Sequence, residues 1–171
     1  MKKARGFTLL EFIIYFALLA TVMTTITSFT LSIITAQAKG KVIAEVETGT
    51  RLALARILRA VRTADSVNAG GSTFDADNGV LSLNNDSTGS ATTTFDLVGG
   101  AVRIRELGTT VPLTTSYVNV SKLRFIKDSQ TNGDVTISVQ ITGNYVSTNA
   151  DRNFVYIGST SGTAMIRKQG T

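Results

Sequence analysis

The stretch GFTLLEFIIYFALLATV, from Gly6 to Val22, decides the architecture of this chain. It opens an apolar run in which no charged residue stands between Glu11 and Lys39. As a helix, residues 12–38 would be about 40 Å long, which exceeds the ~30 Å hydrocarbon core of a bilayer. We therefore expect a membrane-spanning helix near the N-terminus.

Two simpler interpretations explain less of this run. The segment Ala36-Gln37-Ala38 loosely fits a signal-peptidase site, but the apolar run before it is longer than a signal peptide uses. A plain signal anchor explains the basic leader MKKARG through the positive-inside rule. It leaves the carboxylate of Glu11 without a role.

Glu11 needs a partner or a route to water, because an ionised carboxylate in the apolar layer costs roughly 2.5–3.5 kcal/mol on insertion scales. One alternative is that the side chain snorkels to the headgroups. The other requires a cut after Gly6, which would place the new α-amino group of Phe7 four residues before Glu11. That amine, in the same chain or in a neighbouring helix, would neutralise the carboxylate and set a register for assembly.

The segment GFTLLE resembles the cleavage and methylation motif of type IV prepilins and of the related pseudopilins of type II secretion systems. The resemblance implies that a prepilin peptidase, which is also a methyltransferase, cuts after Gly6 and methylates Phe7. It also implies that Glu11 contacts the amine of an adjacent subunit during filament assembly. Three basic residues then form the cytoplasmic leader: Lys2, Lys3 and Arg5.

The resemblance further implies a single-pass protein of the inner membrane with its head outside the cytoplasm, destined for a periplasmic or cell-surface filament. Its partners would be the peptidase, other pilin or pseudopilin subunits, and membrane lipid. Two segments, LARILRAVRTADSV (residues 54–67) and PLTTSYVNVSKLRF (residues 112–125), are similar to segments of J-like minor pseudopilins. We expect a minor pilin or pseudopilin; a major pilin and a monomeric signal-anchored β-domain for adhesion or DNA binding are the alternatives.

Two features of many major pilins are missing from the sequence. Pro112 is the only proline, so the apolar helix lacks the proline that kinks it in many major pilins. The chain has no cysteine, so the disulfide-bounded C-terminal loop of many major pilins cannot form.

Composition argues against an enzyme and gives little support for nucleic-acid binding. The chain has neither His nor Cys, which removes the commonest general base, nucleophile pair and metal ligands. The stretch GSTSG (residues 158–162) superficially resembles a nucleophile elbow, but Thr160 stands at its centre. The net charge is +5, and three of the 17 basic side chains lie in residues 1–6, which leaves 14 against 12 acidic ones. We therefore expect no catalytic residue and no cofactor, and nucleic-acid binding is possible in principle but not indicated.

Helical periodicity continues to about residue 64. Six apolar residues share one face at 100° per residue: Ile43, Val46, Leu54, Ile57, Leu58 and Val61. Four arginines occupy the opposite arc, where we expect solvent or acidic groups of neighbouring subunits rather than phosphates: Arg51, Arg56, Arg59 and Arg62. Either Gly40 or Gly49 would be a suitable place for a bend.

Hydroxyl side chains recur along one stripe of the apolar helix: Thr21, Thr24, Thr25, Ser28, Ser32 and Thr35. Small hydroxyl residues allow two helices to approach closely and hydrogen-bond across their interface. Alternatively, each hydroxyl bonds a carbonyl one turn back in its own helix. The spacing leaves both alternatives open.

From residue 65 the composition changes to turn formers and short β-rich runs. Residues 135–141 alternate as a half-buried strand does, as do 94–97 and 102–105. The apolar phase changes between residues 118–120 and 123–125, which predicts a bulge near Ser121. Further strands are expected at residues 80–83, 154–157 and 164–167, and turns at 78–79, 99–100 and 132–133.

These patterns predict an α+β, pilin-like fold with four parts. They are a leader (residues 1–6), a transmembrane and assembly half-helix (7–38), an amphipathic half-helix (39–64) and an antiparallel β head (65–171). One face of the small antiparallel sheet should cover the apolar stripe of the helix.

Two loops contain clustered oxygen ligands, and both are better explained as turns. Residues 128–139 resemble part of an EF-hand loop but have Val139 at the last position, where the bidentate acid belongs. Asp75, Asp77 and Asn78 could gather around calcium, but Asp and Asn before Gly form turns in any case. We nominate no metal site.

Overall fold

A computed structural model of the chain describes residues 8–129, 134–146 and 155–166. These residues form two compact units, one ending at Gly40 and one beginning at Lys41, which we call the head unit. The elements in chain order are α1 (Leu9–Thr63), β1 (Ser66–Val67), the 3-10 turn η1 (Ala69–Gly71), β2 (Leu81–Asn84), β3 (Thr92–Val98), β4 (Ala101–Glu106), β5 (Thr109–Pro112), β6 (Val118–Ser129), β7 (Val135–Tyr145) and β8 (Ile157–Ile166).

The helix α1 has 55 residues, as long as its proline-free sequence predicts. It runs without interruption through Gly40 and Gly49, the two glycines at which the sequence allows a bend. Gly49 is instead a close-packing position, because a Cβ there would lie 3.3 Å from Cγ2 of Val118. A larger residue would push the helix away from the strand that begins at Val118.

The buried face of α1 lies in the head unit and contains small as well as large residues. Its members are Val42, Val46, Gly49, Thr50, Ala53, Leu54, Ile57 and Val61. The predicted face is confirmed at four positions, but Leu58 is only half-buried and Ile43 is 40% exposed. The apolar pattern overlooks small residues, whereas the sheets come closest to the helix where Gly49 and Ala53 leave room.

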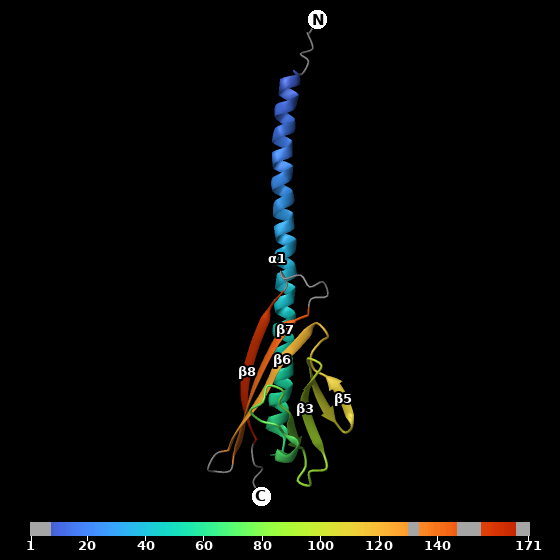
Figure 1. Cartoon of the computed structure of the whole chain (residues 1–171), viewed down its shortest axis with the longest axis vertical. Coiled ribbons are helices and arrows are strands. Elements are labelled where there is room, and N and C mark those ends of the chain that lie inside the picture. The colour runs from blue at the N-terminus through green and yellow to red at the C-terminus, as the bar shows by residue number, and fades with distance from the viewer. Residues whose placement is uncertain (1–7, 130–133, 147–154, 167–171) are drawn as a thin grey trace. The chain divides into compact units, whose positions relative to one another are not determined.

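Two antiparallel sheets cover this face (Figure 1). Strands β1-β2-β3-β4-β5 form a five-stranded sheet, and β6-β7-β8 form a three-stranded sheet, where the sequence led us to expect one small sheet. Large side chains from both sheets are fully buried in one core with Ile57: Phe95, Leu81, Leu83, Phe125, Leu123, Ile137 and Ile141. The α+β, pilin-like architecture is confirmed.

The two sheets meet at the outer edge of β6. Val120 donates its N–H to the carbonyl of Gly100 at 2.7 Å. Leu123, also on this edge, accepts the N–H of Gly79 at 2.8 Å and donates its own N–H to the carbonyl of Asp77 at 2.7 Å. The segment before β2 therefore satisfies backbone groups of β6 that would otherwise be buried without partners.

Most of the expected strands and turns are present. The register between β6 and β7 shifts between Val120 and Lys122, which confirms the bulge predicted near Ser121. Gly99 and Gly100, with φ of +60° and +77°, close a two-residue hairpin between Val98 and Ala101. Such a turn needs positive φ at both central positions, which glycine adopts without strain.

Other strand boundaries differ from the prediction. The ten-residue strand β8 contains residues 164–166 of one expected strand but only Ile157 of the strand expected at residues 154–157. The strands β1 and β5 were not predicted, because β1 has only two residues and all four residues of β5 are exposed, so that neither shows an alternation of buried apolar residues. The expected turn at residues 132–133, and Phe154 and Arg167 at the ends of two expected strands, lie outside the described residues.

Glycines on the inner face of β8 bring this strand close to the helix. A Cβ at Gly158 would lie 3.2 Å from Cγ1 of Val46, and one at Gly162 would lie 2.7 Å from Cδ1 of Leu58. The stretch GSTSG is thus part of a strand, with its glycines towards α1 and Ser159 and Ser161 exposed.

Candidate processing and assembly site

The first described residues form the start of α1. Thr8 accepts a hydrogen bond on Oγ1 from the backbone N–H of Glu11 at 3.3 Å, which satisfies one free N–H of the first helical turn. Glu11 lies in this first turn and is partly exposed, where a carboxylate is favoured by the helix dipole. The other predicted site residues lie outside the described residues: Lys2, Lys3, Arg5, Gly6 and Phe7.

The N-terminal part of α1 has an exposed apolar surface on every side. Each large apolar side chain from Leu9 to Ile34 is at least 40% exposed in the single chain. The helix is long and apolar enough to cross a membrane, and a signal sequence near an N-terminus can have the same length and apolar composition. An apolar surface this continuous is stable in water only when lipid or other protein covers it.

The hydroxyl stripe makes local hydrogen bonds. Thr21 donates to the carbonyl of Ala17 at 2.9 Å, and Thr24 to that of Ala20 at 2.8 Å. Thr25, Ser32 and Thr35 likewise donate to carbonyls four residues back. Five of the six hydroxyls therefore satisfy their donors within the helix, which favours the local alternative for the single chain.

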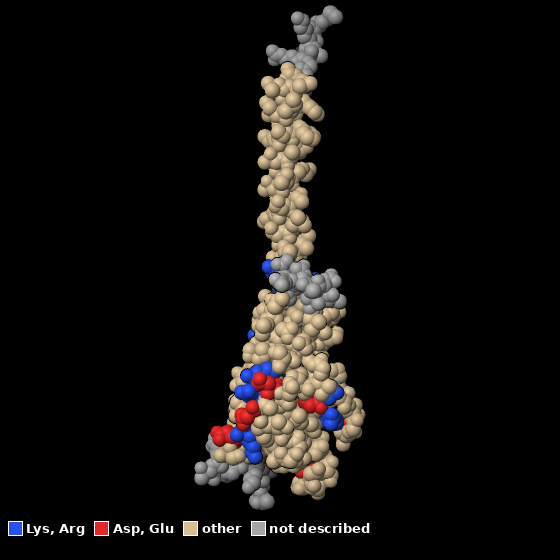
Figure 2. Space-filling view, viewed as in Figure 1, with Lys and Arg blue, Asp and Glu red and all other residues tan. Residues whose placement is uncertain are grey.

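The predicted arginine face is paired in part with acidic groups of the same chain. Arg51 contacts Glu47 at 3.1 Å, one turn back in the helix, and Arg56 contacts Glu106 of β4 at 3.5 Å. Arg59 is exposed beside this second pair, in a shallow pocket that both arginines line. Figure 2 likewise shows basic and acidic side chains mixed on the visible face of the head, rather than one basic field. These acidic partners belong to the same chain, so contact of the arginines with neighbouring subunits stays a prediction, and the mixed charge does not fit a phosphate ladder.

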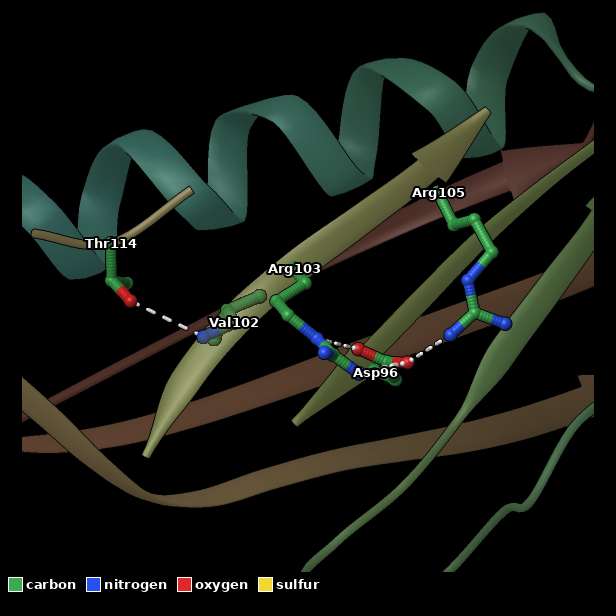
Figure 3. Close-up of polar contacts among 5 residues, drawn as sticks. All are labelled: Asp96, Val102, Arg103, Arg105 and Thr114. Atoms are coloured by element: carbon green, nitrogen blue, oxygen red, sulfur yellow. Dashed lines mark hydrogen bonds and ion pairs between the residues drawn. The ribbon is translucent and has the colours of Figure 1, made fainter. Parts of the chain in front are cut away.

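A carboxylate of the head that contacts two arginines was not found from the sequence. Asp96 of β3 accepts two hydrogen bonds from Arg103 of β4, from Nε at 2.8 Å and Nη2 at 2.9 Å, and one from Arg105 at 3.0 Å (Figure 3). The hydrogen bonds to Asp96 raise the pKa of the Arg103 guanidinium, and their effect is larger than the opposing effect of desolvation. Thr114 contacts the backbone of β4, because its Oγ1 accepts the N–H of Val102 at 3.2 Å.

A second polar contact ties the end of the chain to the helix. The hydroxyl of Tyr156 donates to Oε1 of Glu47 at 3.0 Å. This hydrogen bond raises the pKa of Tyr156 above its ordinary value of 10.0. Desolvation and the negative charge of Glu47 raise this pKa further, and the positive charge of Arg51 lowers it. A contact between residues so far apart in the chain has no local sequence signal.

A third carboxylate shapes the turn between β2 and β3. Desolvation is the largest single influence on the pKa of the Asp86 carboxyl, and by itself it would raise that pKa. The Thr88 hydroxyl, at 2.9 Å, and the N–H groups of Ala91, Gly89 and Ser90 act in the opposite direction. Together they lower the pKa of Asp86 below its ordinary 3.8, since they stabilise the ionised form.

Neither loop with clustered oxygen ligands offers a metal cage in the part of the chain that the structure describes. Asp77 is already neutralised by Arg124 at 2.7 Å and Lys122 at 3.6 Å, which leaves its carboxylate poorly placed for calcium. No group of three or more acidic side chains that could hold a metal ion occurs among residues 8–129, 134–146 and 155–166. Residues 130–133 of the EF-hand-like loop lie outside this part.

Comparison with known proteins adds one finding. Residues 1–27 match the family model described as the prokaryotic N-terminal methylation motif. No curated protein and no solved structure matches the chain significantly. The matched segment includes Gly6 to Val22 and therefore contains the start of the exposed apolar helix. This methylation motif, followed by a long apolar helix and antiparallel sheets, supports the type IV prepilin and pseudopilin family for this chain.

Proposed function

We propose that this protein is a minor pilin or pseudopilin, a structural subunit of a type IV pilus or a type II secretion filament. The methylation motif at residues 1–27 carries this proposal, because it is the recognition site of prepilin peptidase and pilins assemble with other subunits. In this proposal the peptidase cuts after Gly6 and methylates the amine of Phe7.

The membrane topology follows from the same segment. The basic leader stays in the cytoplasm, residues 7–38 cross the inner membrane, and the head lies on the other side. The exposed apolar surface of Leu9 to Ile34 is then covered by lipid before assembly and by neighbouring helices in the filament. Both environments remove it from water.

The carboxylate of Glu11 sets the register of assembly. In a filament the methylated amine of one subunit lies against Glu11 of the next, so that two groups that are costly in an apolar layer neutralise each other. Its place in the first turn of α1 keeps it close to the cytoplasmic end of the membrane span.

The mass of the N-terminal peptide from the native membrane tests this function. We expect a peptide that begins at N-methylated Phe7. An intact N-terminus in cells that contain the peptidase would contradict the proposal and favour a monomeric signal-anchored β-domain. Abundance in purified filaments then separates a minor subunit, present at few copies, from a major pilin.

A further inference from the structure

One end of the three-stranded sheet has an exposed apolar surface, beside which Thr115 donates a hydrogen bond to the carboxylate of Glu45 at 2.8 Å. Five residues form this surface, which we call the tyrosine rim: Tyr117, Tyr145, Val146, Val155 and Ile157. Four of them are exposed, by 54% for Tyr117, 43% for Val146, 68% for Val155 and 66% for Ile157. None of the described residues 113–121, 143–146 and 155–166 is charged.

Backbone contacts make the rim one continuous surface. Val146 donates its N–H to the carbonyl of Tyr117 at 2.9 Å, and Tyr145 donates to Tyr156 at 3.2 Å. The rings of Tyr117 and Tyr145 stack with centroids 6.4 Å apart and planes inclined by 10°. The rim is therefore built by the ends of β6, β7 and β8 together, and it does not depend on one mobile side chain.

The rim lies at the end of the head unit where α1 enters it. Gly158, next to Ile157, packs against Val46, while Gly162 further along β8 packs against Leu54 and Leu58. The exposed Lys41 lies five residues before Val46 on the helix. Charged side chains of the visible face gather at the other end of the head (Figure 2).

The exposed tyrosine and apolar side chains of the tyrosine rim are suited to contact with lipid headgroups. Tyrosine is enriched at membrane interfaces because its ring is apolar and its hydroxyl can bond water or headgroups. A lysine beside such a surface attracts anionic lipid. The uncharged residues 12–38, at about 40 Å, exceed the ~30 Å hydrocarbon core, and a helix with such a surplus tilts.

We infer that the tyrosine rim rests on the lipid headgroups of the outer leaflet while the subunit waits in the membrane, and that it leaves them when the subunit enters a filament. The inference rests on the proposed function, since it requires residues 7–38 to span the bilayer. It adds a second membrane contact to the apolar helix, one made by the head.

Fluorescence quenching in vesicles tests this contact, because the chain has no tryptophan of its own. Single tryptophans are placed in the full chain by Ile157→Trp and Tyr117→Trp, and the protein is reconstituted into phosphatidylcholine–phosphatidylglycerol vesicles. The matched control is Met165→Trp, which is on the same strand and the same face as Ile157, also exposed, and about 27 Å away. Phe16→Trp reports on insertion of the helix.

We expect lipid with a spin-labelled headgroup to quench the tryptophans at positions 157 and 117 and to leave that at 165 bright. Lipid labelled on its acyl chain should quench the one at position 16. If position 16 is quenched but 157 and 117 behave like 165, the rim does not touch lipid and the inference is wrong, while membrane anchoring stands.

Two other results would also overturn the inference. An unquenched tryptophan at position 16 would show that the helix is not inserted, so that the proposed anchoring fails together with the rim contact. A blue shift at positions 157 and 117 that grows with protein concentration, without quenching by labelled headgroups, would assign the rim to contact between copies of the chain.

Discussion

Tyr156 and Glu47 are 109 residues apart in the chain and joined by a hydrogen bond of 3.0 Å from the tyrosine hydroxyl to the carboxylate. The bond links the segment before β8 to the helix that β8 covers, and it makes the stability of the head depend on the protonation state of Tyr156. It was not visible in the sequence, which shows neither residue near the other.

The pH dependence of unfolding should report this bond. Because folding raises the pKa of Tyr156 above its unfolded value of 10.0, the folded state holds the proton more tightly. The resulting stability is fully present below about pH 10 and is lost as the pH rises through the higher pKa of the folded state. Urea unfolding of the full chain in detergent at pH 8 and above pH 10 measures it.

Tyr156→Phe should lower the unfolding midpoint at pH 8 and lose less stability than the wild type above pH 10. Glu47→Gln removes the charge that opposes ionisation and should flatten the profile in the same way. Since both variants break one interaction, their effects should be less than additive when combined. Parallel wild-type and Tyr156→Phe profiles would contradict the linkage.

Ile57→Ala should destabilise the head by about 2–5 kcal/mol, because Ile57 is fully buried between helix and sheets and its truncation leaves a cavity. The matched control is Leu52→Ala on the same helix, where the side chain is 64% exposed and the change should stay within about 0.5 kcal/mol. Denaturant titration of both variants measures the difference. Equal effects would show that the predicted helix face is not the packed one.

Gly143→Val should destabilise by about 1–3 kcal/mol through overpacking. A Cβ at Gly143 would lie 3.1 Å from Cγ2 of Thr50 and 3.3 Å from Cγ1 of Val118, and neither β-branched side chain can easily turn away. Thr142→Val, one residue earlier and on the opposite face, should change stability by less than about 0.5 kcal/mol. A neutral Gly143→Val would mean that the helix stands further from β7 than the structure places it.

Asp96→Asn should cost roughly 1–3 kcal/mol, because it weakens three charge-assisted bonds to Arg103 and Arg105 around a carboxylate that is only 13% exposed. Arg105→Gln removes a single bond from a side chain that is 51% exposed and should cost about 0.2–1 kcal/mol. Thermal or urea unfolding ranks the two. A larger loss from Arg105→Gln would contradict the central role of Asp96.

Glu11→Gln should leave peptidase processing and membrane insertion intact and reduce incorporation into filaments by about tenfold or more, as the loss of an interaction of ~1.4 kcal/mol would. Quantitative immunoblots of sheared filaments against total membranes measure incorporation, and the N-terminal peptide mass controls for processing. Wild-type incorporation would remove the register role of the carboxylate.

Much of the fold was predictable because its signals are local. A proline-free apolar run from Phe12 to Ala38 can form only a long helix, and the alternation of residues 135–141 describes β7 before any partner is known. The change of apolar phase around Ser121 likewise predicted the β6 bulge, since every residue on a strand alternates between two faces. For the candidate site, the motif from Gly6 to Glu11 is equally local, and it predicts processing without any tertiary contact.

What only the tertiary structure decided are the relationships between distant residues. Gly49 was expected to weaken the helix, and its packing role became visible only with Val118 in place. The division into two sheets joined at β6, the Asp96–Arg103 pair and the gathering of the tyrosine rim all depend on which strands become neighbours. The periodicity of a segment shows which of its faces is buried. Which residues cover that face depends on how all other segments of the chain pack together.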